Sequence, residues 1–328
     1  MNRNKINQEV TSGNFGLEAV LKEIATNLGA PLITGNIYFV VPADNANSVQ
    51  FNKYYNTKYE DSTEMVQTTL ALALAACTAD RGDFIFLAPG YALTVTATNV
   101  DLNKAGVTII GLGNGLKRPT FTFGAAAATM TVSAANVTVK NCHHIGNFLD
   151  VAAAYTLAAA KDFRLENNTF VDTSASLGFL SIVVTNATDN DADGLSVVGN
   201  FWYSLDVSPN AFISILAAEL RLYVADNHVD MAATNDVGHF ITLAAKIISG
   251  ARILRNICNV VSSTGAAVGL FLTGSGTTST GVVAENWVTS LDVTAPLFAT
   301  AATNLQFFDN KLSTASSTSG KLWPAAMA

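Results

Sequence analysis

The sequence is poor in charge and in the residues that cross-link or interrupt a chain. Of its 328 residues, 13% are charged, seven are proline and three are cysteine. The cysteines Cys77, Cys142 and Cys258 are odd in number and widely spaced, which argues against a disulfide framework and favours buried free thiols. A chain of this length can bury a large core without such cross-links.

Long apolar runs and basic patches are also missing. No run of about 18 apolar residues occurs, and segments such as Leu70–Ala76 are too short to cross a membrane. The formal net charge is −7, and no basic patch with interleaved aromatic residues is present, so neither a membrane nor a nucleic acid is expected as a partner. The N-terminal Met-Asn-Arg-Asn-Lys continues into polar sequence, so we expect no secretory signal.

What the sequence does contain is one short pattern that occurs seven times between residues 137 and 312. Each copy ends in asparagine, except the first, which ends in cysteine. These end positions are Cys142, Asn168, Asn200, Asn227, Asn256, Asn286 and Asn310. Their spacings run from 24 to 32 residues, and a period of about 28 residues that tolerates insertions is typical of a solenoid.

The residues before these end positions predict a strand. Apolar residues stand three and five positions before nearly every end position, and this period-two alternation indicates a strand with one buried face. The asparagine column predicts a turn, because asparagine tolerates left-handed backbone and its amide can bond to the next coil. Stacked about 4.8 Å apart, these side chains would form a ladder inside the solenoid.

A second apolar segment follows each of the first six end positions by 6 to 14 residues. It begins with an aromatic residue in four repeats, and we expect these rings to stack as one column in the core. They are Phe148, Phe179, Phe212 and Phe240. Two or three strands in each coil of about 28 residues describe a parallel β-helix.

Two helices and a strand are predicted ahead of the repeats. The apolar stripe within residues 17–28 predicts a helix that ends at Gly29 and docks on its own β-helix, on a symmetry mate or on a separate partner. A strand is expected over residues 36–42, a polar loop over 43–61 and a second helix over 62–77.

Glycine-bearing segments after the second helix carry a family resemblance. Residues 81–91 read Arg-Gly-Asp-Phe-Ile-Phe-Leu-Ala-Pro-Gly-Tyr, and residues 106–113 read Gly-Val-Thr-Ile-Ile-Gly-Leu-Gly. Preceded by a helix, this stretch (62–123) resembles the opening of pectate-lyase-like right-handed β-helix proteins, in which the helix plugs the N-terminal end. The resemblance implies an all-β fold with a single right-handed parallel β-helix, a helical cap and a short N-terminal arm. Fold alone does not imply activity.

Three regions are therefore expected. Residues 1–61 would form an arm with a helix and a loop, used for attachment or for trimer contacts. Residues 62–315 would form the β-helix, including its capping helix at 62–77. Residues 316–328 would form a C-terminal tail.

Catalytic strings found in enzymes of this family are missing. Pectate lyases would require an Asp cluster for calcium and a catalytic Arg, and polygalacturonases would require Asn-Thr-Asp, Asp-Asp, Gly-His-Gly and Arg-Ile-Lys. None of these strings occurs, so no catalytic residue, cofactor or metal ligand is assigned.

Two local carboxylate patterns remain to be weighed. Glu285 and Asp309 stand just before the ladder on adjacent coils, about 5 Å apart, a spacing compatible with a retaining glycosidase pair. Arg255 and Asp226 share that column, which favours an exposed salt ladder instead.

The second pattern is Asp189, Asp191 and Asp193, followed by Gly194. It matches the first half of a calcium loop, but Asn200 replaces the final bidentate Glu, so a solvated turn is favoured over a calcium site. His143 and His144 would point to opposite faces of a strand, which argues against a chelating pair.

Three functions remain open. The favoured one is a non-enzymatic structural virion protein, such as a phage capsid decoration protein, head fibre or tail component. It would form a homotrimer and contact other virion proteins such as the major capsid protein. The alternatives are a tailspike-type polysaccharide depolymerase and an adhesin that binds a surface glycan. Aromatic side chains along one outer face would favour the adhesin, but Phe201, Trp287 and Trp323 are scattered in the sequence.

Overall fold

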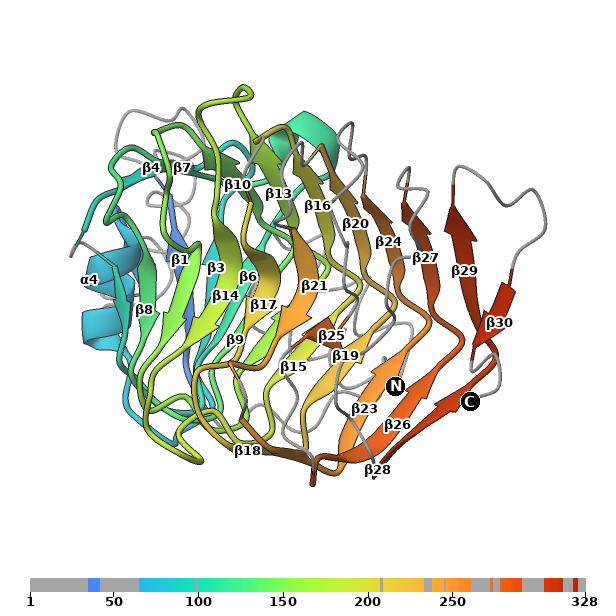
Figure 1. Cartoon of the computed structure of the whole chain (residues 1–328). Helices are drawn as coiled ribbons and strands as arrows, with labels where there is room; N and C mark the ends of the chain where they lie inside the picture. The colour runs from blue at the N-terminus through green and yellow to red at the C-terminus, as the bar shows by residue number, and fades with distance from the viewer. Residues whose placement is uncertain are drawn as a thin grey trace, which may run out of the picture.

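The chain forms a parallel β-helix whose coils stack along one axis (Figure 1). The computed structural model describes residues 35–41, 65–97, 100–206, 209–232, 238–244, 246–260, 272–273, 278–290, 304–314 and 321–323. The predicted helix over 17–28 and the loop over 43–61 lie outside the described residues. The all-β solenoid expected from the repeats is confirmed.

Three long sheets, here called A, B and C, run the length of the solenoid. Sheet A holds 11 strands in the order β2 (Val66–Gln67), β1 (Ile37–Val40), β3 (Phe84–Leu87), β6 (Thr108–Gly111), β9 (Thr138–Lys140), β12 (Arg164–Glu166), β15 (Ser196–Val198), β19 (Tyr223–Ala225), β23 (Ala251–Leu254), β26 (Thr280–Ala284) and β28 (Asn304–Phe308). The strand expected over 36–42 is therefore confirmed as β1.

Sheets B and C form the other two walls. Sheet B consists of β4 (Ala92–Val95), β7 (Thr120–Phe123), β10 (His143–Gly146), β13 (Thr169–Asp172), β16 (Phe201–Ser204), β20 (His228–Met231), β24 (Ile257–Val260), β27 (Trp287–Ser290), β29 (Asn310–Thr314) and β30 (Lys321–Trp323). Sheet C consists of β5 (Asp101–Leu102), β8 (Met130–Val132), β11 (Tyr155–Leu157), β14 (Ser181–Thr185), β17 (Ala211–Ser214), β21 (His239–Thr242) and β25 (Leu272–Thr273). A small two-stranded sheet pairs β18 (Glu219–Leu220) with β22 (Ile248–Ser249).

The seven sequence repeats become seven consecutive strands of sheet A. The register pairs Leu165 with Val139 on one side and with Val197 on the other. These three side chains are fully buried, as the period-two pattern predicted. The strand after each ladder position, which belongs to sheet B, was not predicted, because outward apolar residues such as Phe201, Ile257 and Trp287 mask its alternation.

The predicted aromatic column is only partly correct. Phe212 and Phe240 are fully buried and stack, with ring centroids 5.4 Å apart. Phe179 is also buried, but it meets Phe123 edge-on. Phe148 is 41% exposed, so its assignment to the column was wrong. The coils differ in length between sheets B and C, and the residue that bridges to Phe179 is Val151.

The capping helix is shorter than predicted. Helix α4 spans Leu70–Ala76, with Thr69 as N-cap accepting a bond from the backbone N–H of Leu72 at 3.2 Å. The predicted start at Ser62 was wrong, because Val66–Gln67 instead pairs with β1 at the edge of sheet A. The helix lies at the N-terminal end of the solenoid, which it caps with its buried residues (Figure 1). None of the helices in the described residues could cross a membrane.

All three cysteines are buried free thiols, as expected. Burial raises the pKa of Cys142 to about 12. A thiol with so high a pKa is neutral at physiological pH and therefore unreactive. Cys142 occupies the first ladder position, where its backbone N–H donates to Oδ1 of Asn168 at 2.9 Å.

The asparagine ladder is the most regular feature of the interior. Asn227 accepts a bond from the backbone N–H of Asn200 at 3.0 Å on its Oδ1 atom. Its Nδ2 atom donates to the carbonyl of Val197 and to Oδ1 of Asn256, both at 2.9 Å. Asn200, Asn256 and Asn286 repeat these contacts with their own neighbours. Each amide therefore joins three successive coils.

The left-handed residue of the turn is not the ladder asparagine but the residue before it. All seven of these preceding residues have positive φ, between 49° and 66°. They are Asn141, Asn167, Gly199, Asp226, Arg255, Glu285 and Asp309. This sharp reversal turns the asparagine inward and leaves the preceding side chain on the outer edge between sheets A and B.

The ladder predicts a large loss of stability on truncation of one member. Asn227→Ala removes both amide donors and the acceptor. It leaves the buried backbone N–H of Asn200 without a partner, and it takes one acceptor from the Asn200 side-chain amide and one donor from the Val197 carbonyl. Each buried unpaired group costs about 1–3 kcal/mol, so we expect a loss of about 3 kcal/mol or more in urea unfolding. Asn147→Ala, at an exposed position, is the matched control. A loss below about 1 kcal/mol for Asn227→Ala would contradict this role.

Candidate functional site

The charge column flanking the ladder lies on an exposed edge. Arg255 makes a two-pronged ion pair with Asp226, with Nε–Oδ1 and Nη2–Oδ2 distances of 2.8 Å. Both side chains are 46% exposed, so this pair contributes little stability. Glu285 and Asp309 are exposed on the following coils. Each of these carboxylates belongs to the left-handed residue of its own turn, so each coil presents one of them outward.

The aspartates of the calcium-like loop are used as caps. Asp189 accepts from the backbone N–H of Ala218 at 2.9 Å, and Asp193 accepts from that of Leu220 at 2.8 Å. Asp191 accepts from the side-chain amide of Asn186 at 2.7 Å. Across the part of the chain that the structure describes, no group of three or more His, Cys, Asp or Glu side chains is placed to hold a metal ion.

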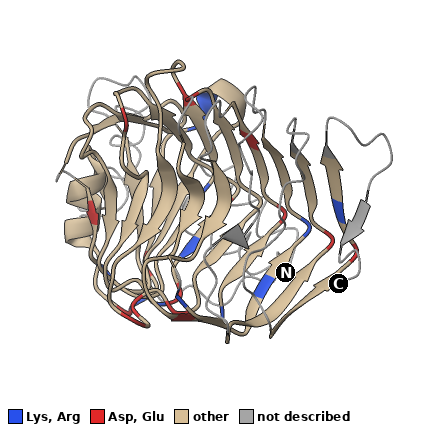
Figure 2. Ribbon diagram, viewed as in Figure 1, with Lys and Arg blue, Asp and Glu red and all other residues tan. Residues whose placement is uncertain are grey.

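A buried glutamate beside this loop carries no sequence signal that would have identified it. Glu219 in β18 is 1% exposed, and its Oε2 atom accepts from the backbone N–H of Ala192 at 3.1 Å. Burial is the main reason why the pKa of Glu219 rises to about 7, and the Asp193 and Asp191 carboxylates add to the shift. Acidic residues gather in the turns along this lower edge of the solenoid (Figure 2).

A second buried carboxylate closes the turn after sheet B. Asp172 accepts from the backbone N–H of Phe179 at 3.0 Å, from the hydroxyl of Ser204 at 2.8 Å and from the backbone N–H of Leu205 at 3.0 Å. Burial raises its pKa to about 6. Gly178 is required beside it, since a Cβ atom there would lie 2.5 Å from the carboxylate carbon. These bonds give Asp172 a structural role within and between coils.

The adjacent histidines point to opposite faces of β10, as predicted. His144 is fully buried, and its Nε2 atom lies 2.8 Å from the hydroxyl of Tyr155. Burial lowers the pKa of His144 to about 3, so the ring is neutral at physiological pH. His143 is half-buried on the outer side, and its Nδ1 atom lies 2.7 Å from Oγ1 of Thr169. The two rings cannot chelate one ion.

The outer face of sheet B brings together side chains that are far apart in the sequence. We call this surface the sheet B strip. Its first column, defined by strand register, is Phe201, His228, Ile257, Trp287 and Lys311. Its second column is Tyr203, Asp230, Asn259 and Thr289. Phe201 and Trp287, which looked scattered in the sequence, therefore share one column.

The first column is aromatic and accessible. Trp287 is 50% exposed, and the Nζ atom of Lys311 lies 5.8 Å from its ring centroid. Phe201 meets the His228 ring edge-on, with centroids 5.2 Å apart. Tyr203 in the second column is 44% exposed. Trp323 lies on β30, which pairs antiparallel with β29, next to the end of the strip.

The second column is a connected hydrogen-bond network. The Nε2 atom of His228 lies 3.0 Å from Oδ1 of Asp230, and the amide of Asn259 donates to the same oxygen at 2.6 Å. The hydroxyl of Thr289 in turn donates to Oδ1 of Asn259. Polar groups on β20, β24 and β27 are thereby held in fixed positions at the surface.

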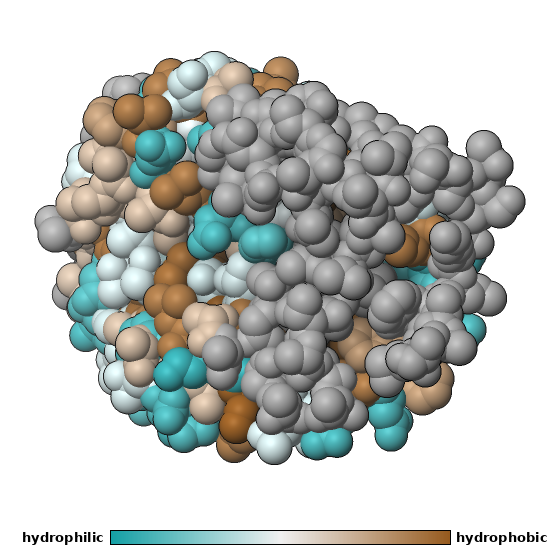
Figure 3. All heavy atoms as spheres, viewed as in Figure 1, coloured by the Kyte–Doolittle hydropathy of each residue, from teal (hydrophilic) through white to brown (hydrophobic). Residues whose placement is uncertain are grey.

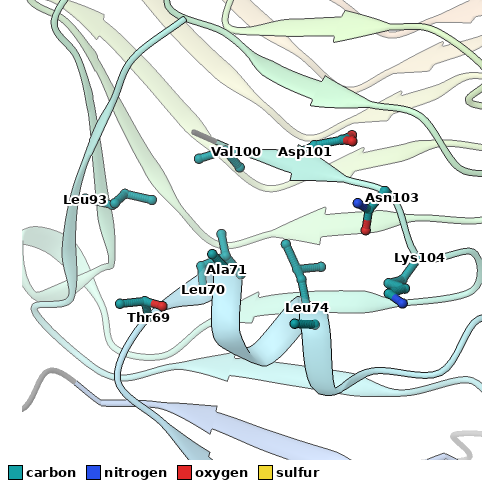
Figure 4. Close-up of a pocket in the computed structure, with 10 residues that line it drawn as sticks. Thr69, Leu70, Ala71, Leu74, Leu93, Val100, Asp101, Asn103 and Lys104 are labelled. Carbon is teal, nitrogen blue, oxygen red and sulfur yellow. The ribbon is translucent and has the colours of Figure 1, made fainter. Parts of the chain in front are cut away.

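A cavity of about 640 Å³ opens beside the capping helix. Its floor is apolar, with Leu70 and Leu74 from α4 facing Leu93 and Val100 (Figure 4). Asp101, Asn103 and Lys104 line its other side. The Asp101 carboxylate accepts a bond from Ser133 at 2.6 Å, so it belongs to the turn. We therefore interpret this cavity as a packing gap between the capping helix and the first coils of the solenoid.

The surface on the side of sheet C has no dominant character. Figure 3 shows hydrophobic and hydrophilic residues interspersed over the described part of this side. The outward residues Thr156, Val184, Ser214 and Thr242 are small, and Thr242 donates to the Ser214 hydroxyl at 3.2 Å. The sheet B strip differs from this face because it carries aromatic rings, a carboxylate and a side-chain amide.

The raised pKa of Glu219 predicts a pH-dependent stability. The folded state holds this proton more tightly than the unfolded state, so its stabilising effect is complete below about pH 4.5 and is lost as the pH rises through about 7. We expect Glu219→Gln to remove on the order of 3 kcal/mol of this pH dependence in urea unfolding. Glu285→Gln, at an exposed site, should leave the dependence unchanged. Parallel curves for wild type and Glu219→Gln would contradict the assignment.

The similarity of this chain to known proteins is weak. No family model matches the chain, and no curated protein matches its sequence. Among solved structures it is similar to a rhamnogalacturonan lyase, with a TM-score of 0.37 and 12% identity over 84% of this chain and 87% of the lyase. It is also similar to ORF18 of Geobacillus virus E2, with a TM-score of 0.33 and 12% identity over 74% of this chain and 57% of that one. Both similarities are weak and assign no function.

Proposed function

We propose that the chain is a non-enzymatic structural β-helix of a virus particle, such as a capsid decoration protein, head fibre or tail component. It would act as a homotrimer and contact other virion proteins, among them the major capsid protein. The observation that carries the proposal is the use of polar side chains to fasten one coil to the next. According to this proposal, the solenoid is a rigid shaft whose outer faces contact the partner proteins.

The asparagine ladder and the buried carboxylates both support a scaffold. Amides from Asn168 to Asn310 bond to neighbouring coils. Asp172, Asp189 and Asp193 accept backbone N–H groups across turns. A glycosidase needs two carboxylates that flank a bound sugar, whereas these carboxylates are already engaged by the fold.

The surface supports self-association. The chain is 49% hydrophobic, and several large apolar side chains of the described residues are about half exposed. These include Leu72, Leu149 and Phe308. Closed symmetric association of solenoids would cover part of this surface.

The trimer is tested by sedimentation velocity on the full chain at micromolar concentration. We expect a single species with three times the 34.4 kDa of one chain, because burial of the exposed apolar residues favours assembly. A mass equal to one chain throughout the concentration series would contradict the trimer.

The non-enzymatic assignment is tested with pure protein and a polysaccharide panel. We expect no release of reducing ends and no unsaturated sugars from any member, since no carboxylate pair is assigned to chemistry. Immunogold microscopy of the native source should place the protein on particles. Turnover of one polysaccharide would refute the structural assignment, and label found only away from particles would refute the virion location.

A further inference from the structure

The sheet B strip combines two features that the shaft itself does not need. Parallel strands lie about 4.8 Å apart, so Phe201 and Trp287, three strands apart in one column, are separated by roughly 14 Å along the axis. The exposed Trp287 ring at one end of this span, and the half-buried Phe201 ring with the exposed Tyr203 ring beside it at the other, make a row of flat apolar surfaces. Such surfaces stack on the apolar C–H faces of sugar rings.

The polar column runs parallel to this row. Both bonds to Asp230, from His228 and from Asn259, end on its Oδ1 atom. The second carboxylate oxygen is thereby oriented by a held side chain and can accept a bond from a ligand hydroxyl. A carboxylate, an amide and a hydroxyl fixed on successive strands match the alternating donors and acceptors of sugar hydroxyls.

The net charge of the strip indicates whether a neutral or a charged ligand fits it better. Asp230 is paired with His228, and Lys311 lies over the ring of Trp287. The strip is therefore close to neutral. Nucleic acid would require a basic groove beside the aromatic residues, and an anionic polysaccharide would require more than the single lysine of these strands.

We propose that the sheet B strip binds a neutral glycan chain that lies along the solenoid axis. Phe201, Tyr203 and Trp287 stack against sugar rings, and Asp230, Asn259 and Thr289 hydrogen-bond to hydroxyl groups. Asp230 is the only carboxylate of the strip as defined, so the glycan is bound and not cleaved. This binding activity goes beyond the structural role proposed above and stands without it.

A second copy of the chain is a poorer occupant. Five strands by four residues cover roughly 300 Å², whereas a stable protein interface buries about 800 Å² on each partner. Polar groups also form one of the two columns of the strip, whereas the core of a homotrimer interface is usually apolar.

The experiment begins with full-length protein on a glycan array that spans neutral hexose polymers, N-acetylhexosamine polymers and anionic uronans. We expect binding to neutral members, followed by calorimetric titration with the best neutral oligosaccharide. Trp287→Ala and Tyr203→Ala should each weaken binding at least tenfold, and Trp287→Phe should retain most of it. Phe308→Ala removes an aromatic ring that is 51% exposed on sheet A and should have no effect. Thermal melting checks that each variant is folded.

Three results would overturn the proposal. These are no binding to any glycan on the array, binding restricted to anionic members, and binding that Trp287→Ala and Tyr203→Ala leave unchanged. Sedimentation of the same variants distinguishes the two candidate occupants of the strip, which are a glycan and a second copy of the chain. If Trp287→Ala dissociates the oligomer while glycan binding is unchanged, the strip is a contact between copies of the chain.

Discussion

The buried asparagine ladder is the constraint on which the rest of the molecule depends. Each ladder amide from Asn168 to Asn286 bonds to the coil before it and to the coil after it, so the register of these coils is tied to that of their neighbours. A buried amide without these partners would be costly. The ladder therefore fixes where sheet A ends and sheet B begins, and it places one left-handed residue outside each amide.

This regularity decides which polar groups remain for function. Carboxylates such as Asp172 and Glu219 are buried and bonded across turns. Those of the charge column face solvent, one on each coil, and Asp226 is paired with Arg255. Sheet C presents small outward side chains. Sheet B, by contrast, carries rings and a fixed hydrogen-bond network on its outer face. A rigid shaft with one recognition face is consistent with both proposals for this protein.

The repeats predicted sheet A and the ladder, because an inward apolar residue recurs at a fixed distance from each asparagine. Insertions between sheets B and C broke that spacing, which is why Phe148 was wrongly placed in the core. Helix α4 was predicted too long because Val66–Gln67 follows the edge of sheet A instead. Phe201 and Trp287 each stand one residue after a ladder asparagine, so the repeat itself places them in one column. That this column faces outward follows only from the burial of the alternate residues of sheet B, such as Trp202 and Val288. Glu219 becomes unusual only through the burial that its coil imposes.

Amide hydrogen exchange of the ladder tests this account most directly. If the amides hold the coils in register, the backbone N–H groups of Asn200, Asn227 and Asn256 should exchange only through global unfolding, with the same free energy as urea unfolding. The free energies of opening measured for these three amides should also decrease by the same amount when denaturant is added. Fast and unequal exchange of these three amides, through local opening of single coils, would contradict the ladder as the central constraint.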